Sequence, residues 1–196
     1  MSCLLLRLSH GREGDLRLTV EEEDFPAPRR RSFHIDEESY AALGSPSAGD
    51  VLDDATLAAL AEAEGRCEAV ARAVRVLSYG ACSANALCLK LRAKGYDRET
   101  AEAAVARMIA RGYLNEPEQA KRLAVLAVRS KCWGSRRVYA YLMHKGYPAA
   151  TARAAIAEAE AEGELDFSEA RARLLAKLPP DAAPEQRRAL LYKYGH

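Results

Sequence analysis

The sequence repeats with a period of 51 residues over most of its C-terminal half. The tripeptide Lys-Gly-Tyr occurs at residues 94–96 and again at residues 145–147, and the same spacing relates Val105 to Ile156 and Leu114 to Leu165. Periods of this length are typical of tandem supersecondary units that bury their hydrophobic faces against one another. The chain is therefore predicted to be a stack of similar units rather than a sandwich or a barrel.

Each unit contains three segments whose apolar residues follow helical spacing. In the first unit the third segment carries an amphipathic stripe, with apolar residues at positions i, i+3, i+4, i+7 and i+8: Ala101, Ala104, Val105, Met108 and Ile109. In the second unit Asn115 is a predicted N-cap, with Glu118 three residues on. We predict a mainly α fold of tandem three-helix repeats at 66–115 and 116–166, with a truncated repeat at 167–196, forming an elongated, curved helical array.

The repeated tripeptide is interpreted as the end of a helix. Gly95 and Gly146 each follow a helical segment with a lysine in its last turn. Glycine readily adopts the left-handed conformation that ends a helix, and lysine is favourable at the negative end of the helix dipole. The aromatic residues that follow, Tyr96 and Tyr147, are predicted to pack between helices.

The N-terminal part has a different pattern. Residues 3–9 and 15–20 read as two short strands joined by the turn 10–14, and a third strand is predicted at 32–36. Short helices are expected to follow, the last of them at 53–65 with Asp53 or Asp54 as its N-cap. We predict an acidic extension over residues 1–65, containing a small β-hairpin, two or three short strands in all, and short helices.

Charge is distributed unevenly along the chain. Residues 1–65 carry 6 basic and 14 acidic side chains, whereas residues 66–196 carry 23 basic and 14 acidic ones. The window 119–157 contains eight lysines or arginines and no acidic residue. A solvated helix face is one interpretation, but such a window favours a surface for a negative partner, either nucleic acid or an acidic protein. The eight are Lys121, Arg122, Arg129, Lys131, Arg136, Arg137, Lys145 and Arg153.

Several classes of protein are disfavoured. The sequence has no phosphate-binding loop, dinucleotide fingerprint, zinc-protease motif or nucleophile elbow, so we do not expect an enzyme. The five cysteines are irregularly spaced, which predicts free thiols and neither a metal site nor a disulfide framework. No segment has the length of apolar sequence that crosses a membrane or the pattern of a secretory signal, so a cytoplasmic protein without a cofactor is expected.

The repeat motifs resemble those of the RecX family of bacterial recombination regulators. The first repeat has the family's serine, its Leu-x-x-Lys-Leu-x-x-Lys-Gly-aromatic run and its later Gly-Tyr-Leu. The matching residues are Ser83, Leu87, Lys90, Leu91, Lys94, Gly95, Tyr96, Gly112, Tyr113 and Leu114. The second repeat matches at Gly134, Arg137, Val138, Leu142, Lys145 and Gly146. The strand-bearing N-terminal part is also similar to that family's extension.

The resemblance implies a regulator of the RecA recombinase. Proteins of this family bind in the groove of the RecA filament on single-stranded DNA and limit strand exchange, ATP hydrolysis and RecA-assisted cleavage of the LexA repressor in the SOS response. We assign the contact with the filament to basic residues of the acid-free window and expect a monomer. They are Arg129, Lys131, Arg136, Arg137 and Lys145, with Lys121 and Arg122 as further candidates. A DNA-binding helical module that acts independently of RecA, and a purely architectural scaffold, are the alternatives.

Overall fold

The computed structural model describes residues 3–11, 15–22 and 27–196. The chain divides into two compact units, one made of Met1–Val74 with Leu91–Arg107 and the other of Arg75–Lys90 with Met108–His196. Most of the described chain is helical, which confirms the predicted mainly α fold. The repeat boundaries and the curved array remain predictions.

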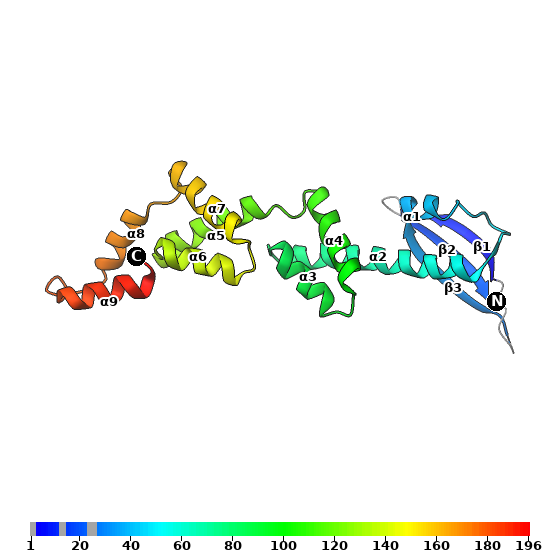
Figure 1. The fold of residues 1–196 in the computed structure, drawn as a ribbon, viewed down its shortest axis with the longest axis horizontal. Coiled ribbons are helices and arrows are strands. Elements are labelled where there is room, and N and C mark those ends of the chain that lie inside the picture. Colours follow the sequence, from blue (N-terminus) through cyan, green and yellow to red (C-terminus); the bar gives the residue numbers. More distant parts are fainter. Residues whose placement is uncertain (1–2, 12–14, 23–26) are drawn as a thin grey trace. The chain divides into compact units, whose positions relative to one another are not determined.

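The first unit begins with a four-stranded antiparallel sheet (Figure 1). Its strands, in the order β3-β2-β1-β4, are β3 (Arg29–Asp36), β2 (Asp15–Glu22), β1 (Cys3–His10) and β4 (Val51–Leu52). The sheet is therefore larger than the small β-hairpin predicted from the sequence, and the prediction was wrong in this respect. β3 starts three residues before the alternating segment because Arg29 and Arg30 pair with Glu22 and Glu21 across the strands, whereas the two residues of β4 are too few to show a pattern. Of the predicted turn, residues 12–14 lie outside the described residues.

One helix covers this sheet and continues beyond it. Leu60 and Ala63 of α2 (Asp54–Ser78) pack with strand residues such as Leu18 and Phe33, and Tyr40 of the short helix α1 (Glu37–Ala42) packs against the same core. The two helices predicted on either side of Gly65 are one helix, because a glycine inside a helix costs only about 1 kcal/mol relative to alanine and does not end it. Asp53 is the N-cap, since its carboxylate accepts a hydrogen bond from the Thr56 amide at 2.8 Å.

Within this unit an ion pair joins the sheet to α4. Arg107, on α4 (Arg98–Ala110), donates a hydrogen bond to the Asp36 carboxylate, which also accepts one from the Ser39 amide at 2.8 Å and so caps α1. Burial alone would raise the pKa of Asp36. The hydrogen bonds from Ser39 and Arg107 outweigh this effect and lower the pKa to about 2.

Asp36→Asn is expected to destabilise the protein in a pH-dependent way. A carboxyl group with a lowered pKa in the folded state stabilises that state above pH 4, and this contribution is lost as the pH falls toward 2. The free energy of unfolding of the wild type should exceed that of the variant by on the order of 1 kcal/mol at neutral pH. This value allows for partial screening of the carboxylate by solvent. Urea unfolding between pH 2 and 7 measures the difference. A gap that stays constant down to pH 2 would contradict the role of the ionised carboxylate.

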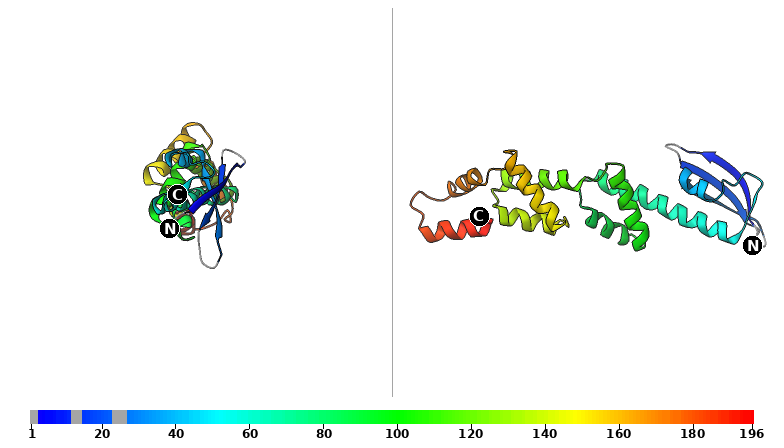
Figure 2. Two further views of the ribbon diagram at one scale, coloured as in Figure 1. Left: turned by 90° about the vertical axis from the view of Figure 1, so that its right-hand side faces the viewer. Right: turned by 45° about the horizontal axis from the view of Figure 1, so that its top comes forward.

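The second unit contains a three-helix group followed by two more helices. The group is α5 (Glu116–Lys131), α6 (Ser135–His144) and α7 (Ala149–Ala161), and the two that follow are α8 (Phe167–Leu175) and α9 (Pro184–Tyr194) (Figures 1 and 2). Much of its core is alanine, which allows the helices to approach closely. The Asn115 cap is confirmed, and so is the left-handed conformation of the two predicted capping glycines, with φ of +99° at Gly95 and +88° at Gly146.

The end of α6 contacts the beginning of α3 (Ala84–Arg92). Ser83, immediately before α3, donates a hydrogen bond from its hydroxyl to the carbonyl oxygen of Lys145 at 2.9 Å. A Cβ atom on Gly146 would lie 2.7 Å from that hydroxyl oxygen, so any other residue here would force the Ser83 side chain to move. Tyr147 comes next and is 2% exposed, as predicted for packing between helices, and burial raises the pKa of its phenol to about 12. Tyr96, its counterpart in the first repeat, is only half-buried.

The end of α9 contacts the beginning of α6 in an equivalent way. The Gly134 amide donates to the carbonyl oxygen of Tyr194 at 2.8 Å, and a Cβ on Gly195 would lie 2.6 Å from the backbone nitrogen of Arg137. Gly134 and Gly195 are separated from each other by nearly the same number of residues as Ser83 and Gly146, and they occupy the same repeat positions. The end of α6 therefore contacts the start of α3, and the end of α9 contacts the start of α6. In each case the partner is the middle helix of the preceding repeat. We name these two contacts the repeat junctions.

Candidate partner-binding surface

Aromatic and basic residues alternate every four positions through α6 and the residues that flank it. The four residues that form this cation–aromatic row are Trp133, Arg137, Tyr141 and Lys145. Residues four apart lie on the same side of an α-helix, so the spacing brings each cation next to an aromatic ring. The side chains of Arg137 and Lys145 are exposed, whereas the rings of Trp133 and Tyr141 are half-buried.

The distances within the row show close packing of cations on rings. The Arg137 guanidinium carbon lies 4.9 Å from the centre of the Trp133 ring, and the Lys145 ammonium lies 5.5 Å from that of Tyr141. Trp133 and Tyr141 meet edge to face at 5.4 Å between ring centres. Lys131, at the end of α5, extends the row, because its ammonium lies 4.5 Å from the Trp133 ring. Each such contact is worth about 0.5–1 kcal/mol at an exposed site, which helps to hold the cations in place.

Two arginines of the candidate surface also take part in the second repeat junction. Arg136 donates to the carbonyl oxygen of His196 at 2.6 Å and lies over the ring of Tyr192 at 5.6 Å. Arg137 donates to the carbonyl oxygen of Lys193. Both guanidinium groups remain exposed, so they can contact a partner as well. Reversing their charge would disturb the junction, which makes Lys131 and Lys145 the better positions for testing the surface.

Lys121 lies apart from this surface. It is only 8% exposed, donates to the Glu162 carboxylate, and lies 3.9 Å from that of Glu158. The hydrogen bond to Glu162 raises the pKa of Lys121. Glu158 and Glu162 are four residues apart, and both carboxylates lie next to the Lys121 ammonium. A buried, paired lysine is poorly placed to meet a partner, so Lys121 is left out of the proposed surface.

The remaining candidates are exposed but lie outside the row. Arg122 pairs with Glu118 one turn earlier on α5, at 2.9 Å. Arg129 donates to the carbonyl oxygen of Glu164 at 3.3 Å. Arg153, which belongs to the acid-free window but is not one of the seven candidates, lies 5.5 Å from the ring of Tyr139. The structure therefore brings three of the seven candidates, Lys131, Arg137 and Lys145, around Trp133 and Tyr141, and Arg136 lies next to Arg137, over Tyr192.

Within residues 3–11, 15–22 and 27–196, no group of histidine, cysteine and acidic side chains could hold a metal ion. In the same part of the chain, no helix combines the length and apolar character that a membrane crossing requires.

Comparisons with known proteins agree with the motifs of the repeats. Residues 69–108 match the family model for the RecX first three-helix domain. A solved structure of a regulatory protein RecX matches over 99% of this chain and 94% of its own, with a TM-score of 0.75 at 17% identity. RecX from Lactobacillus salivarius matches over 68% of this chain and 90% of its own, with a TM-score of 0.58 at 15% identity. A search among curated proteins gives no match. Residues 69–108 thus match the RecX first three-helix domain and the chain has the fold of solved RecX structures, which confirms its resemblance to the RecX family.

Proposed function

We propose that the protein binds the RecA filament on single-stranded DNA and lowers the strand-exchange, ATPase and co-protease activities of RecA. The contact is made by the surface formed by Lys131, Arg136, Arg137 and Lys145, with Arg129 and Arg122 as outlying contributors. Regulation follows from occupation of the filament groove and requires no bond to be made or broken by this protein.

The observation that carries the proposal is the cation–aromatic row on a RecX-like fold. Three exposed cations, Lys131, Arg137 and Lys145, lie within about the length of α6 on this surface. Arginine forms paired hydrogen bonds with phosphates and carboxylates, and lysine supplies a mobile point charge. Both groups suit a filament that presents DNA phosphates and acidic protein side chains together.

RecA-dependent ATP hydrolysis on single-stranded DNA tests the proposal. The rate of hydrolysis is expected to fall as the protein is added and to level off when the filament is saturated, because added protein occupies a finite number of filament sites. Strand exchange measured in the same buffer should fall over the same range of concentration. A hydrolysis rate that is unchanged when the protein is in excess over RecA would refute the proposed function.

The alternative is a DNA-binding module that acts without RecA. Trp133 and Tyr141 favour it, since aromatic rings among cations can stack on the bases of single-stranded nucleic acid. Such a protein would bind bare single-stranded DNA with a steep dependence on salt concentration and leave RecA hydrolysis unaffected except by competition for DNA. Increasing the DNA concentration at constant RecA distinguishes the two, because only competition for DNA is relieved.

A further inference from the structure

An open pocket of about 350 Å³ lies at the second repeat junction, within the second unit. Arg136 and Arg137 line it from the start of α6, and Tyr192, Lys193 and Gly195 line it from the end of α9. Three of these five residues are cations and none is acidic. The pocket combines positive charge with an aromatic ring, which is the chemistry that recognises single-stranded nucleic acid.

Tyr192 has a ring that is free to bind a partner. It is 77% exposed, whereas Leu191 beside it packs against the core of the second unit. The Arg136 guanidinium carbon lies 5.6 Å from the centre of the Tyr192 ring. The rings of Trp133 and Tyr141 are half-buried and meet each other edge to face, so less of their surface is available. Tyr192 is therefore the better placed of these rings for stacking on a base.

The two arginines keep hydrogen-bond donors for a ligand. Arg136 donates to the carbonyl oxygen of His196, and Arg137 donates to that of Lys193. A guanidinium has five N–H groups, so each arginine has further donors for a phosphate. The contacts with α9 also hold the two side chains at the pocket, which lowers the entropy that they lose when a phosphate binds.

Positive charge continues along α9 on the side of Tyr192. Arg188 is exposed and lies one turn before Tyr192, on the same side of the helix. Glu185, the acidic residue of this helix, lies seven residues before Tyr192, which is about 10 Å along the helix axis. A nucleic acid strand that reaches Tyr192 therefore meets Arg188 on α9 and Arg136 on α6.

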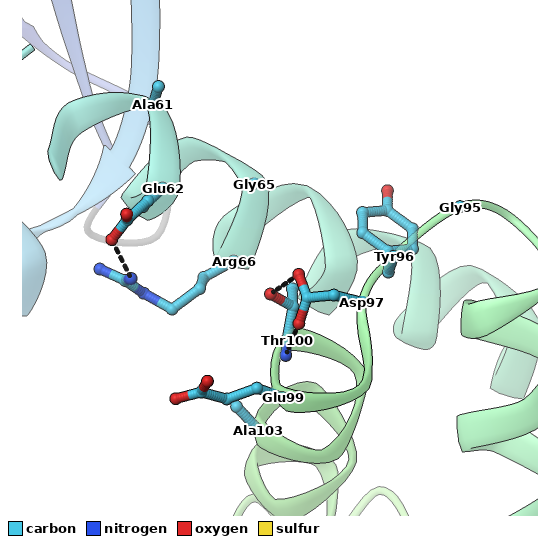
Figure 3. A pocket seen from close by; sticks show the side chains of 10 residues that line it. All are labelled: Ala61, Glu62, Gly65, Arg66, Gly95, Tyr96, Asp97, Glu99, Thr100 and Ala103. Carbon is cyan, nitrogen blue, oxygen red and sulfur yellow. Dashed lines mark hydrogen bonds and ion pairs between the residues drawn. The ribbon is translucent and has the colours of Figure 1, made fainter. Parts of the chain in front are cut away.

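A cleft of about 620 Å³ in the first unit shows that a tyrosine in a cleft is not enough (Figure 3). Tyr96 lies in this cleft together with one guanidinium and three carboxylates. The charged residues are Arg66, Glu62, Asp97 and Glu99. Carboxylates repel phosphate, so this cleft does not suit a nucleotide. The charge around Tyr192, and not its ring alone, distinguishes the pocket of the second unit.

We propose that this pocket binds a nucleotide of single-stranded DNA, with a base stacked on Tyr192 and the adjacent phosphates on Arg136 and Lys193. The proposal rests on the proposed function, in which the protein meets DNA in the RecA filament, and adds a direct contact with that DNA. Stacking uses the face that every base has, so the contact is insensitive to sequence. An acidic protein segment would satisfy the cations but leave the exposed ring unused.

Binding of the full chain to a labelled oligothymidylate of about 12 nucleotides tests this contact by fluorescence anisotropy. Tyr192→Ala should raise the dissociation constant about five- to a hundredfold, because the stacking contact is lost. Tyr192→Phe keeps the ring and should bind like the wild type. Tyr79→Ala is the matched control, since Tyr79 is 87% exposed and belongs to the same unit but not to the pocket. It should also bind like the wild type.

An oligonucleotide with the same phosphates but no bases separates stacking from charge. It should bind the wild type and Tyr192→Ala with the same, weaker affinity. Lys193→Ala should weaken the binding of both oligonucleotides by the same factor and reduce the salt dependence of each, because a phosphate contact is lost.

Three results would overturn the contact with DNA. They are a wild type that does not bind oligothymidylate, a Tyr192→Ala variant that binds it like the wild type, and a variant that loses affinity for an oligoglutamate peptide more than for DNA. The last result would assign the pocket to an acidic protein. The proposed function fails separately, since a wild type that leaves RecA-dependent ATP hydrolysis unchanged refutes it even where Tyr192 contributes to DNA binding.

Discussion

Gly146→Ala is expected to lower the free energy of unfolding by about 2–4 kcal/mol, because two costs add. The residue has φ of +88°, a conformation that alanine adopts only with strain. The new methyl group would also lie 2.7 Å from the Ser83 hydroxyl oxygen, closer than non-bonded atoms approach. Either the Ser83 side chain rotates away, which breaks its hydrogen bond to Lys145, or the junction opens, which also exposes Tyr147. Urea denaturation followed by circular dichroism gives the value.

Gly95→Ala is the matched control for this effect. Its φ of +99° imposes a similar backbone strain, but its Cβ position has open space around it. The control should therefore cost only the backbone strain, about 1 kcal/mol. The difference between the two variants isolates the junction contact. Equal losses at the two positions would show that the junction adds nothing to stability.

The double variant Lys131→Glu with Lys145→Glu is expected to weaken binding to the RecA filament roughly ten- to hundredfold, about 1.4–2.8 kcal/mol. Both lysines are exposed and flank the Trp133–Tyr141 pair, so the change replaces two attractive contacts with two repulsive ones. The protein concentration that halves RecA-dependent ATP hydrolysis measures the loss. The variant should also reduce the dependence of binding on salt, since fewer counterions are released.

A control variant with the same change in net charge distinguishes an effect of this surface from an effect of the overall charge of the protein. Arg171→Glu with Lys177→Glu reverses two exposed cations on and just beyond α8, away from the row. This variant should inhibit RecA almost as well as the wild type. Thermal unfolding of both double variants measures how much stability is lost with the cation–π contacts of Lys131 and Lys145. If both double variants lose inhibition equally, the effect comes from net charge and the assigned surface is wrong.

Helix positions could be predicted from the sequence because their signals are local. Apolar spacing, the Asn115 cap and the capping glycines each depend on residues within one or two turns, and the structure has helices where these signals occur. The extent of the sheet and the continuity of α2 could not be predicted in this way. The pairing of Arg29 with Glu22 is a contact between strands, and Gly65 ends no helix because neighbouring turns are held by packing on the sheet.

The basic region could be located from the sequence, but the contacts within it could not. A window without acidic residues does not show that Lys121 is paired with Glu162, which follows the window along the chain. The spacing of four that relates Trp133 to Arg137, and Tyr141 to Lys145, was present in the sequence and would have indicated the row. The role of Gly146 in the repeat junction had no local signal, because its contact, Ser83, lies 63 residues earlier in the chain.

Trp133 is the only tryptophan of the chain, and it lies at the centre of the proposed surface. Indole emission responds to the charges and solvent around the ring, and here those charges belong to the side chains that would move onto a partner. The unmodified protein consequently carries its own fluorescent reporter. A titration can follow occupancy of this surface without a dye, and a RecA mixture will need a tryptophan-free RecA to keep the signal unambiguous.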